Sequence, residues 1–187
     1  MKQKLSIVHA QKLNSLLKTK RLILEPVVAE HAALLFDLMQ DKAIYHWISA
    51  TPPKSVEQLR QSWLKQELRL APDCDEAWLN WAVRRSSDGV YVGKLDAEVN
   101  SANVATNIGY LFFPEHWGQG YASESVLAVS DHLIQCGVMQ IAAAVTRGNE
   151  ASYRVLEKAG FIRSGIIPDN DVIRGIKYDD VEFIKNP

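Results

Sequence analysis

The segment from residue 114 to 125, "PEHWGQGYASES", places two glycines just before a run of apolar residues with helical spacing. Gly118 and Gly120 permit a backbone at positive φ, and they lack the Cβ atom that would hold a ligand away from the chain. The first N–H groups of the following helix lack intrahelical partners, and the helix dipole adds partial positive charge there. A pyrophosphate is the natural ligand of such a helix end. A Gly-x-Gly pair is more often a tight turn without a ligand, so the surrounding elements must decide between the two interpretations.

The loop matches neither of two common nucleotide-binding motifs. No Gly-Lys-Ser/Thr follows it, as a Walker A motif requires, and Ser123 stands where a Gly-x-Gly-x-x-Gly motif has its third glycine. Its neighbours are more informative. Residues 105–113 and 138–146 are predicted as strands and residues 121–136 as a helix, which forms a βαβ unit with parallel strands. Ligands gather at the carboxyl ends of the strands in such units, where the loop lies.

The remaining elements complete a mixed α/β sequence of the α+β class. A capping box at Ser55 and Gln58 begins one helix, and Asp88-Gly89 turns a hairpin in which Val92, Lys94, Asp96 and Glu98 share one face. We predict a single domain with a mixed, mostly antiparallel sheet, a parallel central crossover and helices on both faces. It spans residues 19–187 after an N-terminal extension, residues 1–18, which either forms a short amphipathic helix or stays loosely attached. Further strands are predicted at 21–27, 77–85, 90–99, 161–165 and 176–184, and further helices at 30–40, 56–70 and 150–159.

Composition limits the partners of the protein. Its net charge is −1 over 187 residues, so no basic footprint for nucleic acid is present, and no apolar stretch approaches the roughly 18 residues that span a bilayer. Cys74 and Cys136 lack metal-ligand spacing and are interpreted as reduced thiols, with a disulfide between them as the open alternative. We expect a cytoplasmic protein without a metal, a nucleic-acid partner or a membrane partner, and either a monomer or a homodimer.

Two segments resemble the cofactor motifs of GNAT-type N-acetyltransferases: "NIGYLFFPEHWGQGYASESV" and, one helix and one strand later, "NEASYRVLEKAGFI". The stretches "TKRLILEPVVAEHAALLFDLM" and "GIKYDDVEF" resemble the same superfamily, in particular its branch of bacterial ribosomal-protein N-terminal acetyltransferases. The resemblance covers about residues 19–185 and implies a GNAT-like domain that uses acetyl-CoA as co-substrate.

The resemblance also implies how acetyl-CoA is bound. The backbone next to the thioester would contact the pantetheine arm, and Asn149 would bond the same arm, although it could equally serve as a helix N-cap. Trp117 stands where the family usually has Gln or Arg. The residues implied for the cofactor are Tyr110, Leu111, Phe112, Gly118, Gln119, Gly120, Tyr121, Ala122, Ser123, Asn149 and Ser152.

Catalysis needs a neutral amine, a donor for the oxyanion and a proton for the departing thiolate. A backbone N–H near Leu111 could stabilise the oxyanion. The resemblance gives the acid role to Ser152, with Tyr153 as a partial substitute, because Leu156 occupies the usual tyrosine position. A local helix-end hydroxyl and a half-buried aromatic are the simpler interpretations of these two residues.

No general base is identified from the sequence. The family's carboxylate positions hold Asn107 and Ala144, and Asp96, Glu98 and His116 are more simply surface groups. The proton of the amine could therefore leave through ordered water.

The acceptor is expected to enter between the segment after the first helix and the loop "IIPDNDVIR". Tyr45, His46 and Trp47 would pack against the acceptor, and Asp169 and Asp171 could attract a cation. The resemblance favours a protein or peptide N-terminus as the acceptor amine. A small amine such as a polyamine, an amino acid or an aminoglycoside is the alternative. A non-catalytic acyl-CoA-binding module is the other alternative, because the usual acid and base positions have lost their groups.

Overall fold

The computed structural model describes residues 4–187, which fold around one eight-stranded sheet with the order β1-β2-β3-β4-β5-β6-β8-β7. Within these residues β5 and β6 pair in parallel and the other neighbouring strands pair antiparallel. The predicted mixed, mostly antiparallel sheet is confirmed. The strands are β1 (Leu17–Lys18), β2 (Leu22–Pro26), β3 (Glu76–Arg85), β4 (Tyr91–Asn100), β5 (Val104–Phe112), β6 (Gln140–Thr146), β7 (Ile162–Ile173) and β8 (Ile176–Lys185). The helices are α1 (Ile7–Leu13), α2 (His31–Leu35), α3 (Val56–Gln66), α4 (Tyr121–Gln135) and α5 (Glu150–Lys158), with 3-10 turns η1 (Leu38–Gln40), η2 (Lys42–Tyr45) and η3 (Pro114–His116).

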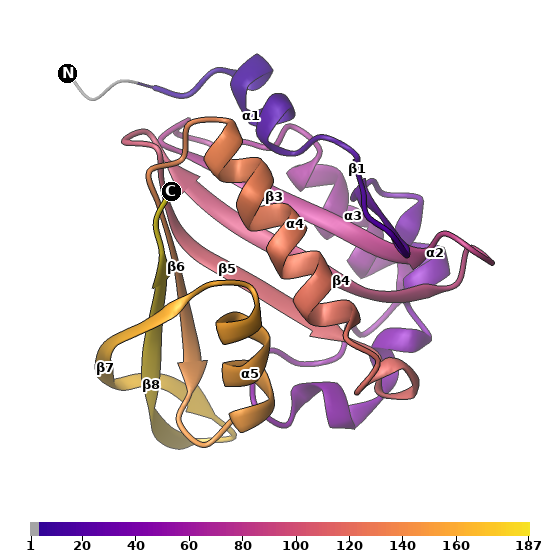
Figure 1. Ribbon diagram of the computed structural model, residues 1–187. Coiled ribbons are helices and arrows are strands. Elements are labelled where there is room, and N and C mark those ends of the chain that lie inside the picture. Colours follow the sequence, from indigo (N-terminus) through magenta and orange to yellow (C-terminus); the bar gives the residue numbers. More distant parts are fainter. Residues whose placement is uncertain (1–3) are drawn as a thin grey trace.

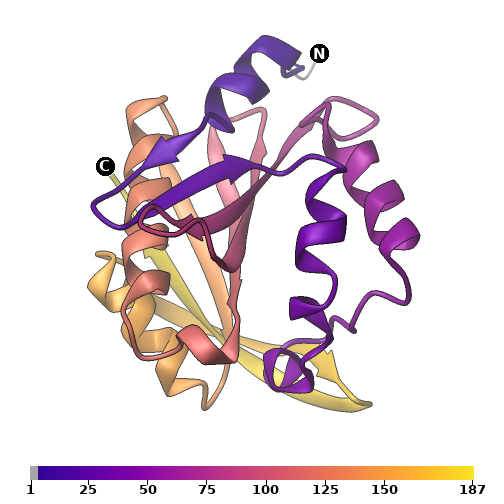
Figure 2. The same ribbon diagram turned by 90° about the vertical axis from the view of Figure 1, so that its right-hand side faces the viewer.

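Helices cover both faces of the sheet, as expected. Figures 1 and 2 show α4 and α5 on one face and α2 and α3 on the other. Two apolar clusters match these layers: the larger includes residues of α1, α4 and α5, and the smaller includes residues of α2, α3 and η2. On α4 the apolar stripe predicted from the sequence is present, since Val126, Val129 and Leu133 are fully buried and Ala122 packs beside them.

The N-terminal segment is part of this core over the described residues. Ala10 and Leu13 of α1 are fully buried in the larger cluster, and β1 extends the sheet beside β2. The Ser6 hydroxyl accepts a hydrogen bond from the His9 N–H and caps α1. Of the two expected forms of the extension, the helix is present. Where a domain boundary should be drawn stays a prediction.

The prediction that Val92 shares a face of its strand with Lys94 was wrong, because a β-bulge interrupts the alternation. In the β3–β4 pair, Gly93 lies opposite Val83 but Tyr91 lies opposite Arg84, so Val92 is an extra residue on β4. Its side chain therefore turns into the larger cluster, away from the face of Lys94. At the same bulge, a Cβ atom on Gly93 would collide with the carbonyl oxygen of Leu111 on β5. The glycine thus permits a close approach of β4 to the part of β5 where the cofactor is expected.

Three predicted boundaries also change. The helix expected over residues 56–70 ends at Gln66. The helix expected over residues 30–40 ends at Leu35 and continues as η1. The loop expected after residue 165 is instead the second half of β7, which continues to Ile173 with irregular pairing between Ile167 and Asp171. Pro168 lies in this irregularity on the outer strand of the sheet, where a residue without an N–H is tolerated. Within residues 4–187, no helix is both long enough and apolar enough to cross a membrane.

Candidate active site

The glycine loop connects η3 to α4 and leaves the first turn of α4 open. Gly118 and Gly120 have φ angles of +72° and +80°, a conformation that side chains other than glycine rarely adopt. Gly120 is the N-cap of α4, and within the described chain no side chain caps the helix there. A Cβ atom at Gly118 would meet nothing within 4 Å. The N–H groups of the first turn therefore stay available for an anionic ligand, and the loop fits a pyrophosphate.

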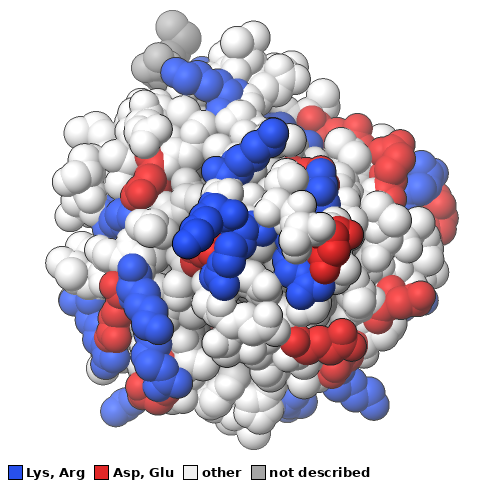
Figure 3. All heavy atoms as spheres, turned by 45° about the vertical axis from the view of Figure 1, so that its right-hand side comes forward, with Lys and Arg blue, Asp and Glu red and all other residues white. Residues whose placement is uncertain are grey.

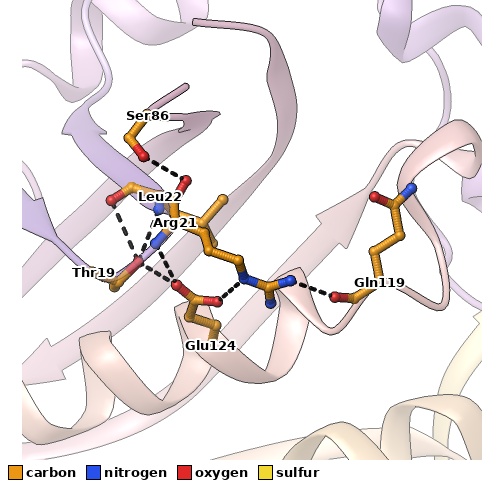
Figure 4. Close-up of polar contacts among 6 residues, drawn as sticks. All are labelled: Thr19, Arg21, Leu22, Ser86, Gln119 and Glu124. Atoms are coloured by element: carbon orange, nitrogen blue, oxygen red, sulfur yellow. Dashed lines mark hydrogen bonds and ion pairs between the residues drawn. The ribbon is translucent and has the colours of Figure 1, made fainter. Parts of the chain in front are cut away.

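The loop is held from outside by a residue that the sequence did not single out (Figure 4). The Arg21 guanidinium donates from Nε to Glu124 Oε2 at 2.7 Å and from Nη1 to the Gln119 carbonyl at 2.9 Å. Thr19 Oγ1 donates to Glu124 Oε1 at 2.6 Å. Burial alone would raise the pKa of Glu124, but the hydrogen bonds from Thr19 and Arg21 outweigh it and lower the pKa below its ordinary value. An ionised Glu124 therefore connects the segment before β2 to the first turn of α4.

The other side chains of the loop bond within the chain. The Arg21 guanidinium lies 4.7 Å from the centre of the Tyr121 ring, which is buried. Gln119 Nε2 donates to the Glu115 carbonyl at 3.1 Å. Trp117 Nε1 donates to the Phe112 carbonyl at 2.6 Å, while about half of the residue's surface (52%) stays exposed. Trp117 thus bonds to the carbonyl oxygen of Phe112, whose backbone was expected to contact the pantetheine arm.

Charged side chains of both signs lie on the face of the molecule shown in Figure 3. In Figure 3, Lys and Arg side chains gather near the centre of the face shown, and Asp and Glu side chains gather toward its right-hand edge. Arg21 and Arg85 each have a carboxylate partner, Glu124 and Asp88, at 2.7 and 2.6 Å. Within residues 4–187 no group of three or more His, Cys, Asp and Glu side chains could hold a metal ion.

The strands on either side of the loop separate next to it. β5 and β6 pair at Val104–Gln140 and Ala105–Ile141, near their amino ends, and then diverge toward their carboxyl ends (Figure 1). The rest of β5 pairs with β4. This parting of the two parallel strands leaves one backbone edge of β5 facing the gap.

Two hydroxyl groups link β5 to α5 across this gap. The Tyr110 and Ser152 hydroxyl oxygens lie 2.5 Å apart, and Tyr110 also donates to the Ser152 carbonyl at 3.2 Å. Burial raises the pKa of Tyr110 to about 12, although the hydrogen bond with Ser152 acts in the opposite direction. Sequence reasoning had assigned only the backbone of Tyr110. The phenol is therefore a neutral partner of the Ser152 hydroxyl at physiological pH.

The start of α5 shows how two other predicted residues are used. The Asn149 side chain accepts a hydrogen bond from the Ser152 N–H at 3.2 Å, so Asn149 caps the helix. The Tyr153 hydroxyl accepts a hydrogen bond from the Gly148 N–H at 2.9 Å, and its ring is buried with the Arg163 guanidinium 4.7 Å from the ring centre. Leu156 is fully buried core. Of the two candidate acids, Ser152 faces Tyr110 at the gap and Tyr153 bonds to the backbone.

The three residues expected to contact the acceptor lie in different environments. Tyr45 is buried in the smaller cluster and donates to the Met39 carbonyl at 2.8 Å, so its side chain is a core group. Trp47 is half-buried and meets the exposed His46 edge-on, with ring centres 4.9 Å apart. Thr146 Oγ1 donates to the Trp47 carbonyl at 3.1 Å, and Arg174 donates to the His46 carbonyl at 3.1 Å. This segment therefore lies over the carboxyl end of β6 and the β7–β8 turn.

The carboxylates considered in the sequence are mostly paired. Lys94 lies 2.7 Å from Asp96, and Lys177 lies 3.2 Å from Asp169, so both carboxylates already have a cation. Burial raises the pKa of Glu98, and the nearby charges of Glu76 and Asp96 raise it further. Glu98 lies opposite Asn107 on β5.

The fold and the site together define a class of protein: an α+β domain with an uncapped helix end beside a split between two parallel strands. Comparison with known proteins agrees. Residues 21–162 match the family model described as acetyltransferase (GNAT) domain. The chain is 28% identical over 171 residues to the uncharacterized N-acetyltransferase YoaA of Bacillus subtilis, covering 88% of this chain and 92% of YoaA.

Solved structures show the same fold. The RimL ribosomal L7/L12 alpha-N-protein acetyltransferase in complex with coenzyme A superimposes with a TM-score of 0.81 at 20% identity, covering 92% of this chain and 98% of RimL. The ribosomal-protein-S5-alanine acetyltransferase of Vibrio fischeri gives 0.79 at 16% identity, with 92% and 96% covered. The chain belongs to the GNAT acetyltransferase family.

Proposed function

We propose that the protein transfers an acetyl group from acetyl-CoA to a primary amine. The observation that carries the proposal is the open glycine loop at the start of α4, located beside the split between β5 and β6. The N–H groups of the loop and first turn, residues 118–123, would hold the pyrophosphate. The backbone of residues 110–112, Asn149 and Ser152 would contact the pantetheine arm. Acetyl-CoA supplies the activated acyl group as a thioester.

The peptide groups of β5 suggest where the oxyanion is stabilised. The Phe113 N–H donates to the Val92 carbonyl, and the Leu111 carbonyl approaches Gly93, so these alternate residues direct their peptide groups toward β4. The Phe112 carbonyl faces away from β4, because it accepts the bond from Trp117. The N–H groups of Tyr110 and Phe112 therefore face the gap. We therefore propose the N–H groups of Tyr110 and Phe112 as the oxyanion donors in place of the Leu111 N–H, because the peptide group of Leu111 pairs with Lys94 on β4.

Ser152 is the proposed proton donor for the departing thiolate. Its hydroxyl lies at the gap, 2.5 Å from the Tyr110 hydroxyl, and Tyr110 can replace the proton once its own hydrogen turns from the Ser152 carbonyl to Ser152 Oγ. This pair needs no ionised side chain, because the raised pKa of Tyr110 keeps the phenol protonated.

A protein or peptide N-terminus is the proposed acceptor. The support is the fold shared with two ribosomal-protein acetyltransferases, and small amines are the alternative. A thiol-release assay with acetyl-CoA tests both. Peptides with free amino-terminal Ala or Ser, polyamines and aminoglycosides would be compared at equal concentrations. Faster thiol release with the peptides supports a protein or peptide N-terminus as the acceptor. Faster release with a small amine would identify that class of amine as the acceptor instead.

A non-catalytic acyl-CoA-binding module is the second candidate. It is favoured by Asn107 at the usual carboxylate position and by the buried Leu156 at the usual tyrosine position. Tight binding of acetyl-CoA in a calorimeter, without thiol release for any amine of the panel, would establish this function instead.

A further inference from the structure

A buried carboxylate on β8 has an oxygen without a partner. Asp180 is 5% exposed, and its Oδ2 accepts a hydrogen bond from Asn170 Nδ2 at 2.7 Å. Within residues 4–187, its Oδ1 has no hydrogen-bond partner. A buried carboxylate oxygen with no donor is costly, and native proteins rarely keep one without a use.

Asp180 lies on the acceptor side of the sheet. Thr146 on β6 and Ile167 on β7 are its direct neighbours in register, so the three side chains share one face. Thr146 bonds to the Trp47 carbonyl, which shows that the segment Tyr45–Trp47 covers this face. Phe183, three residues along β8, points to the opposite face and lies against Tyr153 of α5. Asp180 is therefore one strand away from the gap between β5 and β6, on the side opposite α5.

Cationic side chains on the segments around Asp180 have other partners, and Lys185 on β8 pairs with Asp131. Arg174 donates to the carbonyls of Tyr45 and His46, Lys177 pairs with Asp169, and Arg147 pairs with Asp179 at 3.4 Å. The unpartnered oxygen thus has no donor within the described chain, and because it is enclosed, a donor from outside reaches it only when the side chains that cover it move.

We propose that Asp180 Oδ1 binds the amino group of the acceptor, so that the site takes a primary amine in its ammonium form beneath the segment Tyr45–Trp47, and the amine loses a proton before it attacks the thioester. The inference rests on the proposed function and adds the residue that recognises the acceptor. Trp47 would close the site on one side, and the Asn170 amide would hold the carboxylate in orientation.

The test compares Asp180→Asn with a matched control, Asp131→Asn. Asn keeps the volume of Asp180 and can still accept the bond from Asn170, but it loses the charge. Asp131 lies on α4, away from the proposed acceptor, and pairs with Lys185 at 2.7 Å. The probes are a hexapeptide with a free amino-terminal serine and spermidine. We expect Asp180→Asn to lower kcat/KM for the amine about 10- to 100-fold, the range for a lost hydrogen bond to a charged group. The affinity for CoA should stay within twofold, and Asp131→Asn should match the wild type.

The outcomes separate this inference from the proposed function. If the wild type releases thiol and Asp180→Asn releases it with the same KM for the amine, the inference fails and the function stands. If the wild type releases no thiol, the function fails, and calorimetry of the two amines with the CoA-loaded protein decides the inference. Weaker binding to Asp180→Asn than to the wild type supports it, and equal or absent binding overturns it. Should Asp180→Asn fail to fold, Asp180→Leu, which removes the buried charge entirely, replaces it.

Discussion

The hydroxyl oxygens of Tyr110 on β5 and Ser152 on α5 lie 2.5 Å apart and form a polar link between two elements that flank the split in the sheet. The Tyr110 hydroxyl donates its one proton to the Ser152 carbonyl at 3.2 Å, and in that arrangement the Ser152 hydroxyl donates to the Tyr110 oxygen, so the phenol is oriented toward the first turn of α5. A serine hydroxyl is a weak acid by itself, but a neighbouring hydroxyl that can replace its proton makes it a more effective donor.

The substitution Ser152→Ala is therefore expected to lower kcat about 100-fold, the low end of the range for general acid catalysis. Tyr110→Phe should lower kcat less, because the Ser152 hydroxyl remains. Steady-state thiol release at saturating acetyl-CoA measures both. Tyr153→Phe is the comparison, because the Tyr153 hydroxyl bonds to the Gly148 N–H and should affect stability more than kcat. A larger loss of kcat in Tyr153→Phe than in Ser152→Ala would transfer the acid role to Tyr153.

Stability is expected to fall in strongly alkaline solution because of Tyr110. Its pKa in the folded protein is about 12, raised by burial from an ordinary value of 10.0. A raised pKa means that the folded state holds the proton after the unfolded state has lost it. The contribution of Tyr110 to the free energy of unfolding is therefore complete below pH 10 and is lost as the pH rises toward 12. The loss is at most about 3 kcal/mol. Tyr110→Phe should flatten this part of the curve of unfolding free energy against pH, measured by denaturant titration. Equal slopes for both proteins above pH 10 would contradict the raised pKa.

Gly118 offers a test of the phosphate loop with a matched control in the same chain. Gly118 and Gly89 have φ angles of +72° and +75°, and a Cβ atom at either would meet nothing within 4 Å. Replacement by Ala should therefore cost each variant about 1 kcal/mol of stability through backbone strain. Gly118→Ala should also weaken CoA binding about tenfold or more, since the Cβ would face the ligand, whereas Gly89→Ala should bind CoA as the wild type does. Isothermal calorimetry measures the affinity, and equal affinities in the two variants would mean that the loop is only a turn.

The sequence predicted the features that depend on local pattern or on the family resemblance. It did not predict features that depend on a contact between distant segments. The stripe on α4, the hairpin at Gly89 and the cap at Asn149 follow from spacing within a few residues, and the structure has all three. The inward turn of Val92 depends on a bulge against β3, which β4 alone does not encode.

The partners of polar groups were also beyond the sequence. Tyr110 and Ser152 are 42 residues apart, and Arg21 and Glu124 are 103 residues apart. No periodicity relates such pairs, because they meet only after β5 and α5, or β2 and α4, have packed. Tyr45 is an error of the opposite kind. As an aromatic residue in an apparent loop it was predicted to contact the acceptor, but it is buried and its hydroxyl donates to the Met39 carbonyl.

The contact between Arg21 and Glu124 predicts that a residue outside the cofactor motifs controls cofactor affinity. Arg21 bonds to both the Gln119 carbonyl and the Glu124 carboxylate, so it fixes the loop on one side and the first helical turn on the other. Arg21→Ala should weaken CoA binding about three- to tenfold, because the loop must then be ordered by the ligand itself. The measurement is calorimetric titration with CoA.

Arg60→Ala is the control for this prediction, since Arg60 forms an exposed ion pair with Glu57 on α3 at 2.9 Å and should not alter the affinity. Glu124→Gln should act in the same direction as Arg21→Ala, and it should also remove a contribution to stability. The lowered pKa of Glu124 means that this contribution is present at neutral pH and is lost as acidification passes through the folded-state pKa. If Arg21→Ala and Arg60→Ala bind CoA with equal affinity, the glycine loop is ordered by its own backbone, and the ion pair serves only to attach the segment before β2 to α4.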